Sequence, residues 1–297
     1  RWSGIGGTMR RFMLALAIIA ALPAPAPAST EATSLELPVR AAFYYPWFPS
    51  AWSQKGIFPY TRFHPTLGTY SSSDPVVLGQ HINWMLQAQI EAGISSWFGI
   101  GHHTDARVSG LLQAAEGTPF RWTLYYEMES RGSPSVAAID QDLDYIAAQY
   151  AGHPSFLHVG GRPVIFVYGG SEACEMIDRW MMANEGRFHV VLKVFSNYRY
   201  CPQQPDGWHQ YSPGHRTAQQ KGYSFAVSPG FWKMGESAPR LRRDVGRFRT
   251  DVAAMVASGE PWQLVTTWNE WGENSAMEPA QEWGSTYIEI LASYPTP

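Results

Sequence analysis

Two glutamates three residues apart, Glu270 and Glu273, lie in the stretch Q-L-V-T-T-W-N-E-W-G-E-N-S-A-M-E at residues 263–278. The stretch begins with an apolar and β-branched run that is typical of a buried strand, and it continues into a turn-prone segment. Indole rings flank both acids. Two carboxyl groups at a strand end suit cleavage of a glycosidic bond, in which one carboxyl protonates the leaving oxygen and the other stays ionised.

A simpler interpretation is that both acids are solvated loop residues, since the chain contains 25 Asp and Glu. The neighbouring tryptophans and a third acid, Glu278, immediately before Pro279, favour a site instead. We therefore predict that Glu270 and Glu273 are catalytic.

The start of the chain has the pattern of a secretory signal peptide. Residues 1–8 look like upstream sequence; from Met9, two arginines precede a short apolar run, and small residues up to Ala28 offer a cleavage site. The run is shorter than the roughly 20 residues that span a bilayer. We expect a secreted or periplasmic protein with no stable membrane span in the mature chain, and a flexible leader at residues 29–38.

The charge of the mature chain argues against nucleic acid as a partner. Removing residues 1–28 lowers Lys plus Arg from 22 to 19 against 25 acids, so the net charge is 19 − 25 = −6. We expect the partner to be a poly- or oligosaccharide, because 13 Trp, 15 Tyr and 14 Phe supply flat faces for sugar rings. We also expect the protein to be a monomer.

Neither the cysteines nor the histidines predict a metal site, and we expect no metal and no cofactor. Cys174 and Cys201 are too few for a zinc site, and whether they are bonded stays open, because sequence gives no distance between them. Adjacent histidines on a strand would face opposite ways, which argues against a metal held by His102, His103 and Asp105. We expect Asp105 to cap the following helix and His102 to contact substrate.

Hydrophobic patterning predicts strands that alternate with helices. The expected strands cover 39–45, 94–98, 121–126, 163–168, 188–195, part of 207–211, 223–228 and 263–268. One helix is expected to begin at Asp74-Pro75, with Asp as its cap and Pro at its first position. Further helices are expected over 106–116, 134–150, 172–185, 240–258 and 285–294. Eight strands in this alternation predict an α/β protein, a single-domain (β/α)8 TIM barrel over residues 39–297.

Function in such a barrel sits in the loops that follow the strands. Many aromatic and polar side chains stand at the predicted strand ends. The candidate substrate-binding residues are Tyr44, Tyr45, Trp47, Trp97, His102, Glu127, Tyr168, Tyr198, Trp232, Asn269, Trp271 and Glu278.

The motif W-N-E-W-G-E-N-S-A-M-E-P-A at 268–280 resembles N-E-W-x-E-G-T-x-x-E-P of glycoside hydrolase family 99, the endo-α-mannosidase type. Weaker similarities are F-Y-Y-P-W-F at 43–48, Y-Y-E at 125–127, G-R-P-V-I-F-V-Y at 161–168 and S-P-G-F at 228–231. The resemblance covers about residues 39–291. It implies a family-99-like barrel that acts on α-linked glycans.

The resemblance also implies roles for the two acids. Glu273 would be the general acid and then the base that activates water, while Glu270 would take the proton of the substrate's own 2-hydroxyl to form a 1,2-anhydro sugar, with net retention. The usual retaining scheme, with a glycosyl ester on a carboxylate, stays open. The chain departs from the family where Gly272 replaces a frequent His and Asn274 a frequent Gly; Asn tolerates left-handed backbone, so we expect the turn to survive.

These observations predict a secreted, endo-acting glycoside hydrolase. One alternative is a carbohydrate-binding barrel without catalytic activity, and another is an enzyme that builds or trims cell-surface glycans.

Overall fold

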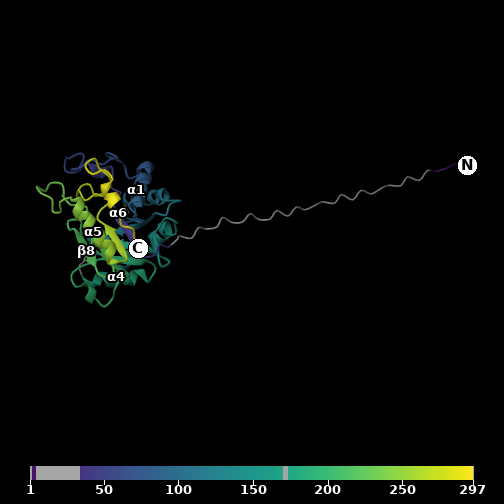
Figure 1. Cartoon of the computed structure of the whole chain (residues 1–297). Helices are drawn as coiled ribbons and strands as arrows, with labels where there is room; N and C mark the ends of the chain where they lie inside the picture. The colour runs from purple at the N-terminus through teal and green to yellow at the C-terminus, as the bar shows by residue number, and fades with distance from the viewer. Residues whose placement is uncertain (1, 5–33, 170–172, 297) are drawn as a thin grey trace. The chain divides into compact units, whose positions relative to one another are not determined.

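The computed structural model describes residues 2–4, 34–169 and 173–296 (Figure 1). The helices and strands given below all belong to one compact unit, which ends at residue 297. The predicted signal peptide, Met9 to Ala28, lies outside the described residues and stays a prediction. Among the helices of the described part, none is long and apolar enough to cross a membrane.

Eight parallel strands form the barrel wall. They are β1 (Val39–Tyr44), β2 (Ala92–Trp97), β3 (Arg121–Tyr126), β5 (Arg162–Val167), β6 (His189–Lys193), β7 (Gly207–His209), β9 (Ser224–Val227) and β10 (Trp262–Val265). They are ordered β7-β6-β5-β3-β2-β1-β10-β9, and β1 pairs with both β2 and β10. Within the described residues no ladder joins β7 to β9. The ring of paired strands is therefore closed except between these two strands. The predicted (β/α)8 barrel fold is confirmed.

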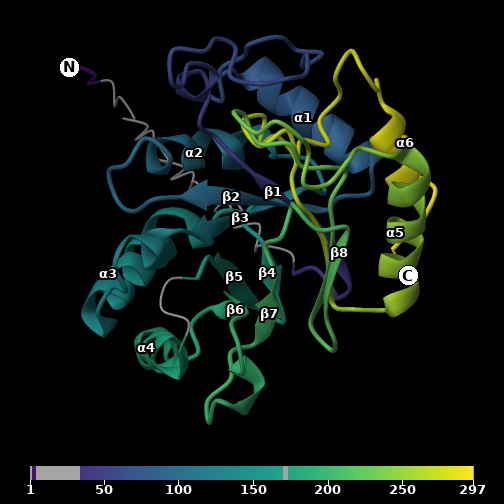
Figure 2. The same cartoon turned by 90° about the vertical axis from the view of Figure 1, so that its left-hand side faces the viewer.

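Two short strands pair antiparallel with the wall. β4 (His158–Val159) pairs with β5, and β8 (Thr217–Gln220) pairs with β9. In Figure 2, β8 lies on the side of the barrel where the ring is not joined.

Helices cover the outside of the sheet (Figure 2). They are α1 (Pro75–Gln87), α2 (Asp105–Ala114), α3 (Val136–Ile146), α4 (Cys174–Asn184), α5 (Val245–Ser258) and α6 (Thr286–Ala292). Short 3₁₀ helices span Ser50–Trp52, Met128–Arg131 and Tyr198–Tyr200, and a π turn, Ala147–Ala151, extends α3. The predicted helix over 240–258 starts too early, because Leu241 pairs with Phe231 and Asp244 caps α5 through the N–H of Arg247 at 2.7 Å.

The start of α1 follows the prediction. The carboxylate of Asp74 accepts from the N–H of Val76 at 2.9 Å, and Pro75 occupies the first helical position, where its missing N–H costs nothing.

The predicted cap at Asp105 is wrong. Thr104 holds the cap position of α2, and Asp105 is its first residue. The buried Asp105 carboxylate instead accepts from the indole of Trp97 at 2.8 Å and from the hydroxyls of Tyr145 and Tyr150 at 3.0 and 2.8 Å. This carboxylate therefore joins the end of β2 to α3 and to the π turn that follows it.

Alternation along β1 decides which side chains face the barrel interior. Ala41 and Phe43 pack into the interior cluster with Phe166 of β5, whereas Ala42 and Tyr44 pack outward against the helices. The parity of each strand thus determines whether an aromatic residue at its end can approach the central cavity.

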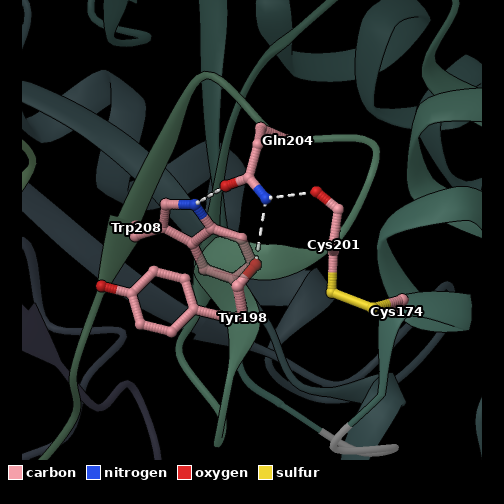
Figure 3. Close-up of a disulfide and its surroundings, with 5 residues drawn as sticks. All are labelled: Cys174, Tyr198, Cys201, Gln204 and Trp208. Carbon is pink, nitrogen blue, oxygen red and sulfur yellow. Dashed lines mark hydrogen bonds between the residues drawn. A yellow bond between two sulfur atoms is a disulfide. The ribbon is translucent and has the colours of Figure 1, made fainter.

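The connection from β6 to β7 contains no α-helix, and cross-links hold it instead (Figure 3). A disulfide joins Cys174, at the start of α4, to Cys201. The side chain of Gln204 donates to the carbonyls of Tyr198 and Cys201, at 2.9 and 3.0 Å, and accepts from the indole of Trp208 at 2.9 Å. The question left open by the sequence is answered: the two cysteines are bonded.

Candidate active site

A cavity of about 320 Å³ opens at the carboxyl ends of the parallel strands. Three carboxyl groups, two lysines and several aromatic rings line it. The lining residues are Trp47, Gln54, Lys55, Tyr60, Tyr125, Glu127, Tyr168, Tyr211, Lys233, Glu270, Gly272 and Glu273. Both predicted catalytic residues and three predicted binding residues, Trp47, Glu127 and Tyr168, meet here.

The loop that carries the two acids is folded by its own hydrogen bonds. β10 ends at Val265, three residues before the predicted end, and the chain then turns. The hydroxyl of Thr267 accepts from the N–H of Glu270 at 3.0 Å, and the N–H of Ser275 donates to the Glu270 carbonyl at 3.3 Å. Asn274 has a φ of 51°, the left-handed conformation expected at this position.

Glu270 is the more deeply buried of the pair, with 8% of its surface exposed. Burial raises the pKa of its carboxyl well above the ordinary value, and the nearby charges of Glu273 and Glu127 raise it further. The Lys233 ammonium opposes this shift. Burial and the two neighbouring carboxyls thus disfavour a charge on Glu270.

Glu273 lies nearer to solvent and has a cationic partner. Its Oε1 is 3.3 Å from Nζ of Lys233. Burial raises the pKa of Glu273, whereas Lys233 and Arg240 lower it. Since the two carboxyls interact, their protons belong to the pair, and like charges at close range resist double ionisation.

The third carboxyl, Glu127, follows β3. Burial raises its pKa to about 7, against the hydrogen bond from Ser96 and the charge of Arg131. The Ser96 hydroxyl donates to Glu127 at 2.5 Å and accepts from the indole of Trp47 at 3.1 Å. One wall thus presents an indole face beside a carboxyl group, a combination that suits a sugar ring and its hydroxyls.

Tyrosines form much of the remaining wall. Burial holds the pKa of Tyr211 and Tyr125 well above the usual range. The next cause is the charge of Glu273 for Tyr211 and the charge of Glu127 for Tyr125. Their hydroxyls therefore stay neutral. The Tyr125 hydroxyl also lies 3.1 Å from Nε2 of His209, below the cavity.

Six of the lining side chains were not predicted from the sequence. Gln54, Lys55 and Tyr60 belong to the long irregular segment after β1, where no periodicity marks a residue as part of a site. Tyr125 and Tyr211 stand at or after strands, and Lys233 follows the turn after β9. These three carry the same strand-end signal that selected Glu127.

Three predicted binding residues are corrected, because their side chains pack away from the cavity and do not line it. The Tyr44 hydroxyl is 3.1 Å from Nδ1 of His81, and Tyr44 is fully buried in the outer core. The Trp97 indole is fully buried and donates to Asp105. Tyr198 packs on Trp208, with ring centroids 4.5 Å apart.

Three further predicted residues lie beneath the cavity and support the loop with the acids. Glu278 is fully buried and accepts from the Tyr70 hydroxyl at 2.7 Å and the Trp271 indole at 3.0 Å. Asn269 is fully buried and bonds to the main chain of Tyr45. Asn269, Trp271 and Glu278 are therefore corrected from substrate contacts to structural supports.

The last three predicted residues do not line the cavity. The buried ring of Tyr45 packs on Trp47 at 4.4 Å. Trp232 lines a neighbouring apolar pocket, under the guanidinium of Arg62 at 4.1 Å. His102 is half-buried on the loop after β2 and bonds to Thr104. In the described ranges no group of three His, Cys, Asp or Glu is arranged to hold a metal ion.

Paired carboxyls at the mouth of a (β/α)8 barrel, surrounded by tyrosine and tryptophan rings, define a carbohydrate-type active-site cavity. The sequence model described as glycosyl hydrolase family 99 matches residues 41–188, about half of the chain. The matched segment contains Trp47, Glu127 and Tyr168 and ends before the two acids.

The chain resembles glycoprotein endo-alpha-1,2-mannosidases of Mus musculus and Rattus norvegicus. The mouse protein is 31% identical over 119 residues, which cover 36% of this chain and 25% of the relative. The rat protein is 30% identical over 119 residues, with the same coverage of 36% and 25%. The chain thus spans about a quarter of the length of these curated relatives in the alignment.

The solved family-99 endo-alpha-mannosidase from Bacteroides thetaiotaomicron has a closely similar fold. Its TM-score is 0.68 at 20% identity, with 86% of this chain and 96% of that chain covered. A solved glycoside hydrolase-like protein follows, with a TM-score of 0.62 at 12% identity and coverage of 93% and 98%. The chain belongs to the family-99, endo-α-mannosidase-like group of glycoside hydrolase barrels, as its motifs predicted.

Proposed function

We propose that the protein is an endo-acting glycoside hydrolase that cleaves α-linked glycans, with Glu270 and Glu273 as its catalytic pair. The observation that carries the proposal is the meeting of these two acids with Glu127 and tyrosine hydroxyls in one open cavity. The names of the mouse and rat relatives support an α-mannoside as the substrate.

The roles are those that the resemblance to glycoside hydrolase family 99 implies. The leaving oxygen needs a proton, and Glu273, nearer to the cavity mouth, supplies it and then activates water. Glu270 accepts the proton of the sugar's 2-hydroxyl, whose oxygen attacks the anomeric carbon and forms a 1,2-anhydro sugar. Opening of that ring by water gives net retention. Neutral tyrosines and Trp47 hold the sugar in the cavity.

A glycosyl ester on one carboxylate is the competing retaining route. A substrate whose 2-hydroxyl is replaced by hydrogen separates the two routes. The anhydro route requires that this substrate resist cleavage, and a rate comparable with that of the parent glycan would rule the route out.

Incubation with a panel of α-mannans and α-glucans, followed by chromatography, tests the activity itself. We expect shortened oligosaccharides from an internal α-mannosidic linkage. Binding without products would instead indicate a carbohydrate-binding barrel that has lost catalysis.

We further propose that the protein is exported and works as a monomer. The Cys174–Cys201 bond supports export, since disulfides persist in oxidising compartments. The N-terminal residue of protein recovered outside the cytoplasm tests this proposal. A start near Ser29 is expected, and retention in the cytoplasm with an intact N-terminus would contradict it. Light scattering of the purified protein tests the oligomeric state.

A further inference from the structure

Lys233 is fixed opposite Glu273 by main-chain hydrogen bonds on both sides of it. The N–H of Trp232 donates to the Glu273 carbonyl at 2.9 Å, and the N–H of Met234 donates to the Gly272 carbonyl at 3.0 Å. The Asn274 side chain adds a third link, since its Nδ2 donates to the Trp232 carbonyl at 2.7 Å. The loop after β9 and the loop with the acids therefore hold Lys233 in register with Glu273.

The ammonium of Lys233 makes only a weak contact with Glu273. The distance of 3.3 Å exceeds the 2.7–2.9 Å of a strong charged hydrogen bond. Half of the Lys233 side chain is exposed, and Lys233 lines the cavity. A glycan hydroxyl entering the cavity can replace this contact at a small cost, because exposed ion pairs contribute little.

The contact with Lys233 opposes the arrangement of charge that the proposed reaction needs. The reaction requires a proton on Glu273 and a negative charge on Glu270. Burial raises the pKa of both carboxyls, and at Glu273 the charges of Lys233 and Arg240 oppose that effect and favour the ionised form. The contact between Lys233 and Glu273 must therefore be released when substrate binds.

We propose that Lys233 is a positioning residue whose ammonium favours an ionised Glu273 in the empty cavity and leaves it when a glycan binds. The inference rests on the proposed function. Loss of the ammonium from Glu273 lets the proton that the two carboxyls share reside on Glu273. Glu270 becomes the carboxylate that accepts the 2-hydroxyl proton, and the total number of protons on the pair is unchanged.

Other charged and titratable groups that face the pair come from several elements. They are Glu127 after β3, Tyr45 and Lys55 after β1, Tyr168 after β5, Tyr211 after β7, and Glu236 and Arg240 in the loop after β9. The tyrosines stay neutral, and Arg240 is paired with Glu236. Of the cations near the acids, Lys233 is the one in direct contact with Glu273.

The test compares Lys233→Met with Lys233→Arg, which keeps the charge. The pH profile of kcat/KM reports on the free protein, and that of kcat on the complex. In Lys233→Met we expect both limbs of the kcat/KM profile to move to higher pH by about half a unit, the scale of one exposed ion pair. The kcat profile should stay in place, and Lys233→Arg should restore the kcat/KM profile. An unmoved kcat/KM profile, or equal movement of both profiles, overturns the proposal.

A second readout does not depend on turnover. NMR titration of the Glu273 side-chain carboxyl in the free protein, assigned with Glu273→Gln, should show a higher midpoint in Lys233→Met than in the parent chain. Equal midpoints overturn the proposal. If no glycan is cleaved but the midpoint shifts, the proposed function fails while the Lys233–Glu273 interaction stands.

Discussion

The side chain of Asn269 is hydrogen-bonded at both ends to the main chain of Tyr45. The Tyr45 N–H donates to Oδ1 at 2.7 Å, and Nδ2 donates to the Tyr45 carbonyl at 3.1 Å. Asn269 is fully buried and immediately precedes Glu270. The end of β1 thereby fixes where the chain enters the turn that carries Glu270 and Glu273.

Replacing Asn269 by Ala should therefore impair both stability and catalysis. The change leaves the buried N–H and carbonyl of Tyr45 without partners, which costs about 1–3 kcal/mol each. We expect a loss of several kcal/mol in the free energy of unfolding, measured with urea, and a drop of at least about tenfold in kcat, since misplaced catalytic groups lose up to about a hundredfold. An unchanged kcat in the folded variant would show that this anchor does not position Glu270.

Gly272 leaves room for the Glu270 carboxylate. A Cβ built at this position would lie 3.2 Å from Oε1 of Glu270 and 3.3 Å from a ring carbon of Tyr60. We expect Gly272→Ala to lower kcat/KM by about tenfold, because a sub-ångström displacement of Glu270 disturbs proton transfer.

Gly79→Ala is the matched control, since its Cβ would meet nothing within 4 Å in the exposed face of α1. It should keep full activity and gain about 0.5–1 kcal/mol of stability. Equal activity of both variants would refute the crowding argument.

Glu127 makes folding stability depend on pH. Its pKa is raised to about 7 in the folded protein, whereas an unfolded glutamate titrates near its ordinary value of 4.5. Between these two values the folded state binds more protons, so stability contributed by the neutral carboxyl is lost as pH rises from about 4.5 to about 7.

The shift corresponds to about 3 kcal/mol as an order of magnitude. Glu127→Gln keeps a neutral side chain at every pH. We expect the difference in unfolding free energy between Glu127→Gln and the parent chain to favour the variant by that amount more at pH 8 than at pH 4. A difference that does not change with pH would mean that Glu127 is not buried as described.

The fold could be predicted from the sequence because each barrel strand is an apolar run with its own turn signal. The strand within 207–211 was found even though β7 spans only Gly207–His209. Boundaries were harder. The strand predicted over 94–98 begins two residues earlier, at Ala92. Gly93 belongs to β2 because the ring of Trp122 lies over it, and a Cβ at this position would be 2.1 Å from that ring.

The site could be predicted only in part. Glu270 and Glu273 carry a motif, and Glu127 directly follows a strand. The prediction that Tyr44 binds substrate is wrong, because a shift of one residue along a strand turns a side chain from the barrel interior to the helices. Tyr60 and Lys55 were missed because they reach the cavity through irregular backbone, whose path depends on tertiary contacts such as the bond from the Tyr60 N–H to the Trp52 carbonyl at 2.8 Å.

The central claim is that the two acids act on one glycosidic bond. The most direct test is the rate of cleavage of an unactivated α-mannan oligosaccharide by Glu270→Gln and Glu273→Gln. Glu116→Gln, an exposed residue after α2 paired with His153, serves as control. We predict a loss of at least about a hundredfold in each of the first two variants, with the control unaffected. A near-normal rate in either Glu270→Gln or Glu273→Gln would contradict the role of that residue.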